Sequence, residues 1–427
     1  MSSNIPESKK KRIVIVGGGF GGLTLAEKLK NSSYQIVLID KLNYHQFPPL
    51  LYQVSTSGLE PSAISFPYRK IFQRHNDFYF RMAEVFKINA GEQNIETSIG
   101  KIDYDYLVLA AGSDSNYFGN ENLKQYTFPM KSIPESLTLR NRLLQNLEKA
   151  LTANNSKQRQ ALLNVAIVGA GATGVEIAGA IAEMKRYILP KDYPDLNIKE
   201  VQILLIEGSD RILRAMSYQA SQKAQSFLEE MGVTVKLNTM VENYDGNLLQ
   251  FSNGESWTTA TVIWCSGVKG VDFNGIPQNV MGRGNRIKVN RYNEIEELPH
   301  IFAIGDICLQ SEPAYPNGYP QVAPVAIQQG KHLANNFLRL EQGIQLLPFC
   351  YNDKGSMATI GRNKAVADLL GLRFSGLSAW ILWMTVHLMS ILGVKNKIII
   401  LLNWVWNYFT YDQSLRLIIK PSSHPKI

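Results

Sequence analysis

Hydrophobic positions along this chain form short, nearly continuous runs that alternate with amphipathic stretches of helical length. Near the N-terminus, the apolar run IVIVGGG enters a glycine turn, an amphipathic stretch follows, and a second apolar run ends at Asp40. The same order restarts at Asn164, and the later run IFAIGDIC looks like a return to the first set. Nearly continuous apolar strands favour parallel sheets that are covered by helices on both faces. The pattern predicts an α/β fold with two Rossmann-like dinucleotide-binding domains, the second inserted in the first.

The first glycine turn has the spacing Gly17-x-Gly19-x-x-Gly22 between a strand and a helix. The first glycine permits a tight turn, the second lets a pyrophosphate approach the backbone, and the third permits close packing of helix and strand. The helix N-terminus offers free N–H groups and a positive dipole to the phosphates. Asp40 follows 18 residues after Gly22, where a carboxylate accepts hydrogen bonds from ribose hydroxyls. These residues predict a dinucleotide site.

A second glycine motif with the same spacing opens the repeated unit at Gly169, Gly171 and Gly174. Glu207 ends its second strand, 33 residues after Gly174, because a polar insert with two prolines (residues 187–200) separates them. We expect that insert to be a connection on the surface. A carboxylate at Glu207 repels a 2′-phosphate, so the motif favours NADH over NADPH, although Arg211 nearby weakens that preference.

The formal charge of +8 raises the question of a nucleic-acid or anionic-membrane partner. Basic residues are dispersed except for a cluster at residues 9–12, and no basic stripe is interleaved with aromatic residues, so nucleic acid is not an expected partner. Cys265, Cys308 and Cys350 are far apart in the sequence and form neither a CxxC pair nor a metal-ligand motif, so no metal is expected. The N-terminus lacks the apolar core of a signal peptide, so we expect the chain to start in the cytoplasm.

The last part of the chain contains two apolar runs, at residues 377–394 and 398–411. Their lengths of 18 and 14 residues are marginal and too short, respectively, for a simple membrane span, so we expect helices that lie in one leaflet. A transmembrane hairpin, and a helix pair packed on protein or at a dimer interface, are the alternatives. Aromatic and basic residues typical of the headgroup region lie in and near these runs: Trp380, Trp383, Trp404, Trp406, Tyr408, Tyr411, Lys395, Lys397, Arg416 and Lys420.

Two dinucleotide sites on one chain suggest one nucleotide that is held and one that is exchanged, as a flavin and NADH are in hydride transfer. The chain resembles the type II NADH dehydrogenases, single-subunit NADH:quinone oxidoreductases of the two-dinucleotide-binding-domain flavoprotein superfamily. The similarity is carried by IVIVGGGFGGL, HQFPPLLYQVST, DYLVLAAGS, IVGAGATGVEIAGAIAE, IFAIGDIC, AIQQGKHLANN and YNDKGSMATIGRNKAV. The glycine motifs mark only the superfamily, whereas GATGVE, AIQQG and DKGSMATIGR are narrower.

The resemblance implies which residues contact each nucleotide. Tightly bound, non-covalent FAD is expected at Gly17, Gly19, Gly21, Gly22, Asp40, Lys41, Val85, Gly112, Asp306, Ala326 and Ile327. NADH is expected at Gly169, Gly171, Gly174, Glu176, Glu207 and Gly267. The implied catalytic residues are Glu176, near flavin and quinone, and Gln328. The implied quinone contacts are Gln328 and Gln329, although Pro324 stands where the family commonly has a further glutamine, which makes Gln328 the better single candidate.

Plain structural roles are the alternatives for three of these residues. Asp306 suits a strand-ending turn, Glu176 suits a helix start where it complements the dipole, and Gln328 suits a helix cap or a solvent-facing amide.

The resemblance further implies FAD-dependent oxidation of NADH with two-electron reduction of ubiquinone or menaquinone in a respiratory chain, without proton pumping. It implies a monotopic protein on the cytoplasmic face of a bacterial inner membrane and leaves a homodimer open. The implied domains are FAD-binding at 1–130 and 286–345, NADH-binding at 131–285 and membrane-anchoring at 346–427. A sulfide:quinone oxidoreductase, which needs paired cysteines near the flavin, is the rival enzyme. A membrane-docked flavoprotein that binds partners in response to NADH is the non-enzymatic alternative.

Overall fold

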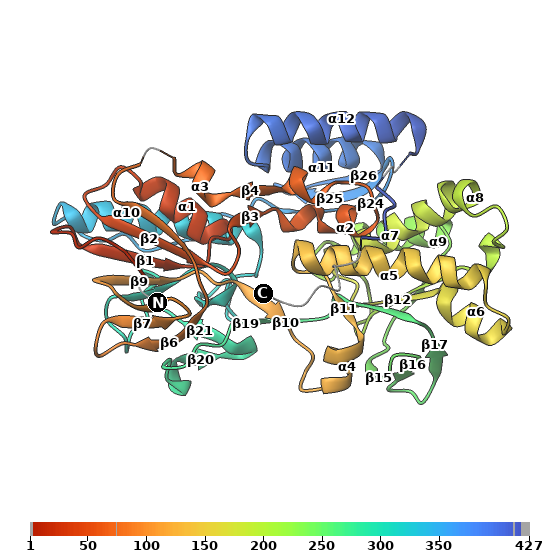
Figure 1. Cartoon of the computed structure of the whole chain (residues 1–427), viewed down its shortest axis with the longest axis horizontal. Coiled ribbons are helices and arrows are strands. Elements are labelled where there is room, and N and C mark those ends of the chain that lie inside the picture. Colours follow the sequence, from red (N-terminus) through yellow and green to blue (C-terminus); the bar gives the residue numbers. More distant parts are fainter. Residues whose placement is uncertain (1–2, 74, 413–414, 420–427) are drawn as a thin grey trace. The chain divides into compact units, whose positions relative to one another are not determined.

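The computed structural model of the chain describes residues 3–73, 75–412 and 415–419, which form two compact units. Each unit is built from three segments: Met1–Gln46, Ser65–Asp114 and Val268–Asp353 in the first, and Phe47–Ile64, Ser115–Gly267 and Lys354–Ile427 in the second. The chain therefore leaves the first unit, builds most of the second and returns (Figure 1). Lys420, one of the basic residues noted in the tail, lies outside the described residues.

A five-stranded parallel sheet forms the centre of the first unit, in the order β22-β9-β1-β2-β5. Its strands are β1 (Arg12–Val16), β2 (Gln35–Asp40), β5 (Phe78–Met82), β9 (Tyr106–Leu109) and β22 (Ile301–Ala303). The register places Val14 of β1 between Val37 and Leu107, and all three side chains are buried. Because β22 pairs with β9, the late apolar run does return to the first module, and the predicted insertion is confirmed.

Helices α1 (Phe20–Leu29) and α10 (Ala323–Glu341) lie side by side in the first unit (Figure 1). They approach through glycine, because a Cβ on Gly330 would lie only 2.5 Å from the Gly21 carbonyl oxygen. Farther along α10, Phe337 packs edge-to-face on Tyr34 and Tyr106, with ring centroids 5.9 and 5.3 Å away. The Tyr34 hydroxyl also donates to the Phe337 carbonyl at 3.0 Å. These contacts hold α10 in place beside the first glycine turn.

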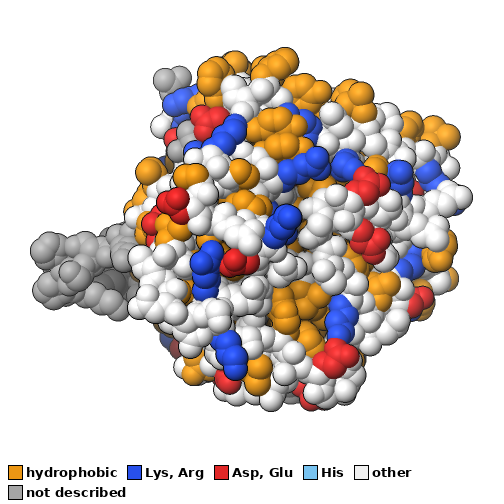
Figure 2. All heavy atoms as spheres, turned by 90° about the vertical axis from the view of Figure 1, so that its right-hand side faces the viewer, with side chains coloured by type: hydrophobic (Ala, Val, Ile, Leu, Met, Phe, Trp, Pro, Cys, Tyr) orange, Lys and Arg blue, Asp and Glu red, His pale blue; other side chains and the backbone are white. Residues whose placement is uncertain are grey.

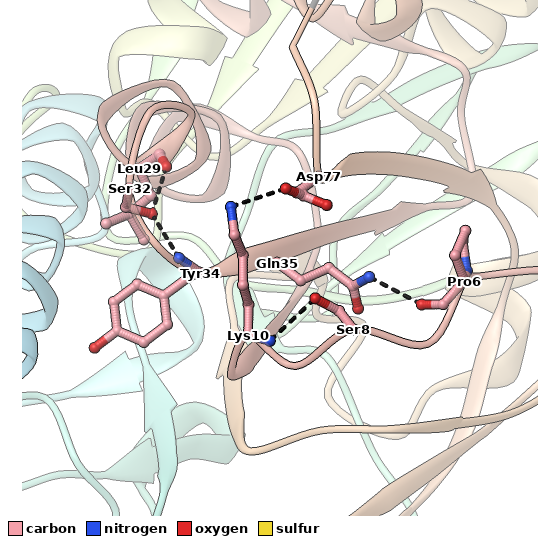
Figure 3. A network of polar contacts seen from close by, with 8 residues as sticks. All are labelled: Pro6, Ser8, Lys10, Leu29, Ser32, Tyr34, Gln35 and Asp77. Atoms are coloured by element: carbon pink, nitrogen blue, oxygen red, sulfur yellow. Dashed lines mark hydrogen bonds and ion pairs between the residues drawn. The ribbon is translucent and has the colours of Figure 1, made fainter.

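The segment before β1 is tied to the rest of the first unit by the polar contacts in Figure 3. Lys10 forms an ion pair with Asp77, with 2.8 Å between Nζ and Oδ2, and the Gln35 amide donates to the Pro6 carbonyl at 2.9 Å. Arg12 donates to Oε1 of Gln35 at 2.6 Å. Two basic residues of the N-terminal cluster therefore serve the packing of this unit.

The second unit repeats this topology in a sheet of order β11-β18-β12-β13-β14. Its strands are β11 (Phe128–Pro129), β12 (Asn164–Val168), β13 (Gln202–Ile206), β14 (Val233–Lys236) and β18 (Thr261–Trp264). Ala166 of β12 lies between Leu204 and Val262, as Val14 lies between its partners in the first sheet. All the pairings are parallel, as the sequence pattern predicts.

Three long helices accompany this sheet: α5 (Ile133–Leu151), α7 (Ala172–Tyr187) and α9 (Tyr218–Glu230). The insert after α7, expected on the surface, instead contains the short helix α8 (Leu189–Asp192) and places Leu189 and Leu196 in a buried cluster with Leu147. The expectation is therefore wrong in part, since the apolar residues of the insert have a helix to pack against.

The C-terminal part of the second unit is a three-stranded antiparallel sheet followed by two helices. These elements are β24 (Ser356–Gly361), β25 (Lys364–Leu369), β26 (Leu372–Ser375), α11 (Leu377–Ser390) and α12 (Val394–Thr410). The first helix is shorter than its apolar run and the second begins earlier than predicted, because Gly393, with a φ of +76°, separates them. Among the described residues, no helix combines the length and apolar character that crossing a bilayer requires.

The two C-terminal helices divide their aromatic residues between core and surface. Trp383 and Trp404 are 2% and 8% exposed, so the expectation that these two lie at a headgroup boundary is wrong. Trp406 and Phe409 of α12 are 60% and 76% exposed. Figure 2 shows hydrophobic side chains along the upper edge of the molecule, the level at which Figure 1 draws α12. Other exposed apolar side chains of these helices are Leu377, Ile381, Val386, Met389, Val394, Ile398, Leu401, Leu402 and Val405.

Shorter elements complete both units. In the first they are β3 (Tyr44–Gln46), β4 (Ser65–Pro67), α3 (Tyr68–Ile71), β6 (Val85–Asn89), β7 (Asn94–Thr97), β8 (Gly100–Asp103), β19 (Val268–Gly270), β20 (Met281–Gly282), β21 (Arg286–Lys288) and β23 (Cys308–Leu309). In the second they are α2 (Leu51–Ser55), α4 (Glu121–Tyr126), α6 (Ser156–Leu163), β15 (Val241–Tyr244), β16 (Leu248–Phe251) and β17 (Ser256–Thr258), while β10 (Ser113–Ser115) lies at the boundary.

Candidate functional site

The first glycine turn, between β1 and α1, requires glycine at two positions and is open at a third. Gly17 has a φ of +101°, and a Cβ there would lie 2.4 Å from the Ala110 carbonyl oxygen. A Cβ on Gly22 would lie 1.9 Å from the Gly17 carbonyl oxygen. At Gly19 a Cβ would meet none of the described atoms within 4 Å, so the main chain at the start of α1 is open. Such a helix N-terminus suits the phosphates of a dinucleotide.

Asp40, at the end of β2, is hydrogen-bonded to this turn. Its Oδ2 accepts from the Gly18 amide at 2.6 Å and from the Tyr68 hydroxyl at 3.3 Å, and its Oδ1 accepts from the Leu42 amide at 2.8 Å. Burial raises the pKa of the Asp40 carboxyl, against the lowering effect of these bonds. Tyr68 and His45 also bond the Gly18 carbonyl, at 2.8 and 3.0 Å. Sequence reasoning missed both, although His45 lies in the quoted run HQFPPLLYQVST.

Four further candidates for the first nucleotide lie in the same unit and are accessible. Lys41 is exposed and forms an ion pair with Glu84 at 2.8 Å, directly before Val85 of β6. Gly112 follows β9 with a φ of +73°, and a Cβ there would meet no described atom within 4 Å. Val85, Gly112 and Ile327 are each half-buried. A ligand could therefore reach all four of these residues.

The turn after β22 connects Asp306 to the loop after β9. Its Oδ2 accepts a hydrogen bond from the Ser113 hydroxyl at 2.6 Å, and Ser113 directly follows Gly112. Gly305 has a φ of +75°, and a Cβ there would lie 3.3 Å from the Cβ of Ala326 in α10. These residues therefore meet at the carboxyl ends of parallel strands, the edge where open α/β sheets bind ligands.

Gln328 and Gln329 lie near the start of α10, and both amides are bonded within the first unit. Gln328 donates to the Asn352 carbonyl at 2.9 Å and accepts from the Asn352 amide at 3.0 Å. Gln329 is 1% exposed and accepts from the Gly305 amide at 2.7 Å, which supports a structural role. Their predicted contacts with quinone stay predictions. Pro324 lies in the first turn of α10, where the missing N–H removes no helical hydrogen bond.

The second glycine turn, between β12 and α7, repeats the geometry of the first. Gly169 has a φ of +97°, and a Cβ there would lie 2.8 Å from the Cys265 main chain. A Cβ on Gly174 would lie 1.9 Å from the Gly169 carbonyl oxygen, whereas at Gly171 it would meet no described atom within 4 Å. The same close approach and the same open position therefore recur.

Glu207 corresponds in position to Asp40. Its Oε2 accepts from the Ala170 amide at 2.8 Å, as Asp40 accepts from the second residue of the first turn, and its Oε1 accepts from the Ser209 amide at 2.9 Å. Arg211 donates to the Met216 and Arg214 carbonyls of its own loop, so its guanidinium is engaged locally. The Arg211 guanidinium is therefore directed away from the Glu207 carboxylate at the end of β13.

Gly267 closes the loop after β18 with a φ of +78°. Its carbonyl accepts from the Asn116 amide at 3.2 Å, and a Cβ there would lie 2.7 Å from the Phe118 ring. The loop therefore requires glycine at this position.

Glu176 lies beyond the first turn of α7 and is 8% exposed, so its alternative role as a first-turn partner of the helix dipole is wrong. Burial raises its pKa to about 8, against the opposing effects of the Thr359 amide and the Trp383 indole. The indole contact is weak, since Nε1 of Trp383 makes no hydrogen bond of ordinary geometry with the described residues. Glu176 lines a cavity of about 120 Å³ whose walls include Tyr52, Glu183, Arg362, Trp383 and Tyr411.

The three cysteines are free thiols, with Cys308 buried, Cys265 half-buried and Cys350 exposed. Burial raises the pKa of Cys265 to about 12 and that of Cys308 to about 11, so both are protonated near neutral pH. The environments of Cys265 and Cys308 do not suit a reactive redox thiol.

Two family models match the chain. The pyridine nucleotide-disulphide oxidoreductase family matches residues 11–330, and the NDH2 C-terminal domain matches residues 354–411.

Curated relatives are similar over nearly the whole chain. Type II NADH:quinone oxidoreductase Ndh of Mycobacterium tuberculosis is 33% identical over 94% of this chain and 89% of its own length. Type II NADH:quinone oxidoreductase NdhA of the same organism is 33% identical over 92% of this chain and 86% of its own length.

Among solved structures, NDH2 of Plasmodium falciparum in complex with NADH has a TM-score of 0.88 at 20% identity, covering 96% of this chain and 100% of that one. The sulfide:quinone oxidoreductase of Aquifex aeolicus has a TM-score of 0.71 at 17% identity and covers 96% of each chain. At these identities the likeness shows the fold alone.

Proposed function

Because the chain belongs to the type II NADH:quinone oxidoreductases, we propose that it oxidises NADH and reduces a membrane quinone through a non-covalently bound FAD. The overall reaction takes NADH, a quinone and one proton to NAD⁺ and a quinol. The observation that carries this proposal is the repeated site: each unit has a glycine turn whose second residue donates its amide to a strand-ending carboxylate, Gly18 to Asp40 and Ala170 to Glu207.

We assign FAD to the first unit. The open main chain at Gly19 and Gly112 suits the pyrophosphate. The Asp40 carboxylate accepts hydrogen bonds from two main-chain amides and has further lone pairs that can accept one from a ribose hydroxyl. Asp306 at the carboxyl end of β22 suits a polar contact with the rest of the nucleotide. The flavin, when bound, supplies a two-electron acceptor.

NADH is assigned to the second unit at Gly169, Gly171, Gly174, Glu207 and Gly267. Glu207 is bonded to main-chain amides, whereas the guanidinium of Arg211 is directed to the carbonyls of its own loop rather than to this carboxylate. A 2′-phosphate would therefore be repelled, which favours NADH over NADPH.

For the quinone, Glu176 suits a proton donor, because its raised pKa keeps it protonated near neutral pH and it lines a cavity with aromatic walls. Gln328 is half-buried near the start of α10, and quinone binding there would compete with its bonds to Asn352.

The exposed apolar side chains of α11 and α12 support docking on a membrane, where a lipid quinone is available, and we propose its cytoplasmic face. We propose a peripheral attachment, to which Lys395 and Lys397 add charge. We also propose the four domain ranges predicted from the sequence, and a homodimer.

Steady-state turnover tests this function. The purified holoenzyme should oxidise NADH with a short-chain quinone, turn over NADPH much more slowly, and show no oxidation of sulfide. Turnover of sulfide without NADH turnover would contradict the proposal in favour of the rival enzyme. In the same assay, Gln328→Ala should slow quinone reduction more than reduction of the flavin by NADH, and equal effects on both would remove Gln328 from the quinone site.

A further inference from the structure

The cavity beside Glu176 contains a second buried carboxyl that the proposed reaction does not yet use. Glu176 and Glu183 are seven residues apart on α7, which is about two helical turns, so they lie on the same face of the helix. Both line the cavity, and Ala180 lines it between them. The two carboxyls therefore border the same cavity within the second unit.

The surroundings of Glu183 act on the pKa of its carboxyl in two opposite directions. Its Oε1 accepts from the main-chain amide of Arg362 at 2.6 Å. Burial raises the pKa of Glu183, opposed by that amide and by the charge of Arg362. The guanidinium itself lies over the rings of Tyr408 and Tyr411, 4.8 and 3.4 Å from their centroids, and donates to the Asn407 carbonyl.

The cavity has both the volume and the polar demand for water. A volume of about 120 Å³ has room for several water molecules at roughly 30 Å³ each. Trp383, which lines it, is 2% exposed, and beyond its weak contact with Glu176 its Nε1 makes no hydrogen bond with the described residues. A buried indole N–H needs an acceptor, which a water in the cavity would supply.

At the other end, the cavity reaches the surface of the unit. Tyr187, one turn beyond Glu183 on α7, stacks on Tyr411 with 4.0 Å between ring centroids, and both rings are half-buried. The titratable and charged groups that line the cavity with Glu183 come from α2, α7, α12, the residue after α12 and the β24–β25 turn: Tyr52, Glu176, Tyr187, Arg362, Tyr408 and Tyr411.

We propose that Glu183, together with water in this cavity, forms the route by which Glu176 regains a proton from solvent during quinone reduction. The inference rests on the proposed function, whose overall reaction consumes one proton for each NADH. Protonated Glu183 releases its proton through water to the Glu176 carboxylate and then takes another from solvent, so no electrons move in this step. Glu183 acts through Glu176 and is a relay residue rather than a catalytic one.

The test replaces Glu183 by glutamine, which keeps an oxygen for the Arg362 amide but carries no exchangeable acid proton. Under anaerobic conditions, a short-chain quinone should reoxidise the reduced flavin of Glu183→Gln at least roughly tenfold more slowly than that of the parent protein. The rate at which NADH reduces the flavin should be unchanged. Imidazole, a small proton carrier, should restore a large part of the lost rate, and Glu183→Asp should keep part of it. The matched control is Glu229→Gln, an exposed carboxyl on α9 of the same unit, which should stay within twofold.

An infrared pH titration of the protein without substrates gives a readout that does not depend on turnover. The carboxylic-acid bands of the parent protein should include one that Glu183→Gln removes and Glu229→Gln retains. A wild-type rate of quinone reduction in Glu183→Gln, or a slow rate that neither imidazole nor Glu183→Asp improves, would overturn the relay. If the parent protein itself fails to reduce quinone, the proposed function is wrong. If Glu183→Gln keeps every carboxylic-acid band of the parent protein, the assignment of a proton to Glu183 is wrong, whatever the rates.

Discussion

Two titratable side chains of the second unit are buried in ways that shift their pKa values in opposite directions. Burial raises the pKa of Glu176 from 4.5 to about 8. His387 stacks on Trp383 with 4.0 Å between centroids and bonds its carbonyl through Nδ1 at 2.7 Å, and burial lowers its pKa from 6.5 to about 4. Between about pH 4.5 and 8 the folded protein thus holds a proton on Glu176 that the unfolded chain releases, and between about pH 4 and 6.5 it lacks one on His387 that the unfolded chain binds.

We expect Glu176→Gln to change how stability depends on pH. Because the folded pKa of Glu176 is raised, its contribution is fully present below pH 4.5 and is lost as pH rises to about 8. As pH rises from about 5 to about 9, the parent protein loses this contribution and the variant has none to lose. The unfolding free energy of the variant minus that of the parent should therefore increase by roughly 3 to 5 kcal/mol over this range. Urea unfolding of the FAD-loaded proteins at both pH values measures this, and parallel pH dependences would contradict it.

Residue roles set by local sequence were predictable, and those set by distant contacts were not. The glycines of both turns and the strand-ending Asp40 and Glu207 follow from spacing, because the turn itself dictates them. The two bonds from Gln328 to Asn352 join residues 24 apart, and the cavity contact of Glu183 depends on how α7 meets the C-terminal sheet. Nothing in the local pattern signals either contact.

At the scale of elements, the periodicity of apolar residues predicted the strands of both sheets, since buried parallel strands leave continuous apolar runs. The ends of the C-terminal helices were predicted less well, because the polar residues 395–397, which separate the two apolar runs in the sequence, lie at the start of α12, and the break comes earlier, at Gly393 with its positive φ. The packing of α7 on β24 was not predictable. It depends on Gly179, where a Cβ would lie 1.7 Å from the Ile360 carbonyl oxygen.

Gly179→Ala should therefore destabilise the protein by about 3 kcal/mol or more, because helix and strand must separate to admit the methyl group. Urea unfolding measures the loss. Gly91→Ala is the matched control, since Gly91 lies in an exposed turn where a Cβ meets no described atom within 4 Å, and it should change stability by less than about 0.5 kcal/mol. Equal stabilities for the two variants would show that α7 and β24 adjust without cost.

At the scale of the whole molecule, the internal duplication and the insertion were readable from the repeated order of runs. The composition of the units was not: Phe47–Ile64 lies within the first module in sequence but belongs to the second unit. There Gln53 accepts from the Trp404 indole at 2.9 Å, and Tyr52 packs 6.3 Å from the Trp383 ring. A short segment that joins a helix about 350 residues away leaves no periodic signal.

The exposed face of α12 leads to a prediction about lipid binding. Replacing Trp406 and Phe409 together by serine should weaken binding to anionic vesicles at least roughly tenfold, since each large apolar side chain contributes about 1.5 to 3 kcal/mol when buried. Vesicle flotation measures the bound fraction. Leu340→Ser, at an exposed position of α10 in the other unit, is the control and should bind as the parent protein does. Undiminished flotation of the double variant would exclude α12 as the docking face.

The most direct measurement of the central claim is an anaerobic titration of the purified protein, first with NADH and then with a short-chain quinone, followed by visible absorbance. The account predicts a yellow protein whose flavin band bleaches with one equivalent of NADH and returns with one equivalent of quinone. A colourless protein, or a flavin band that NADH bleaches and quinone does not restore, would contradict it.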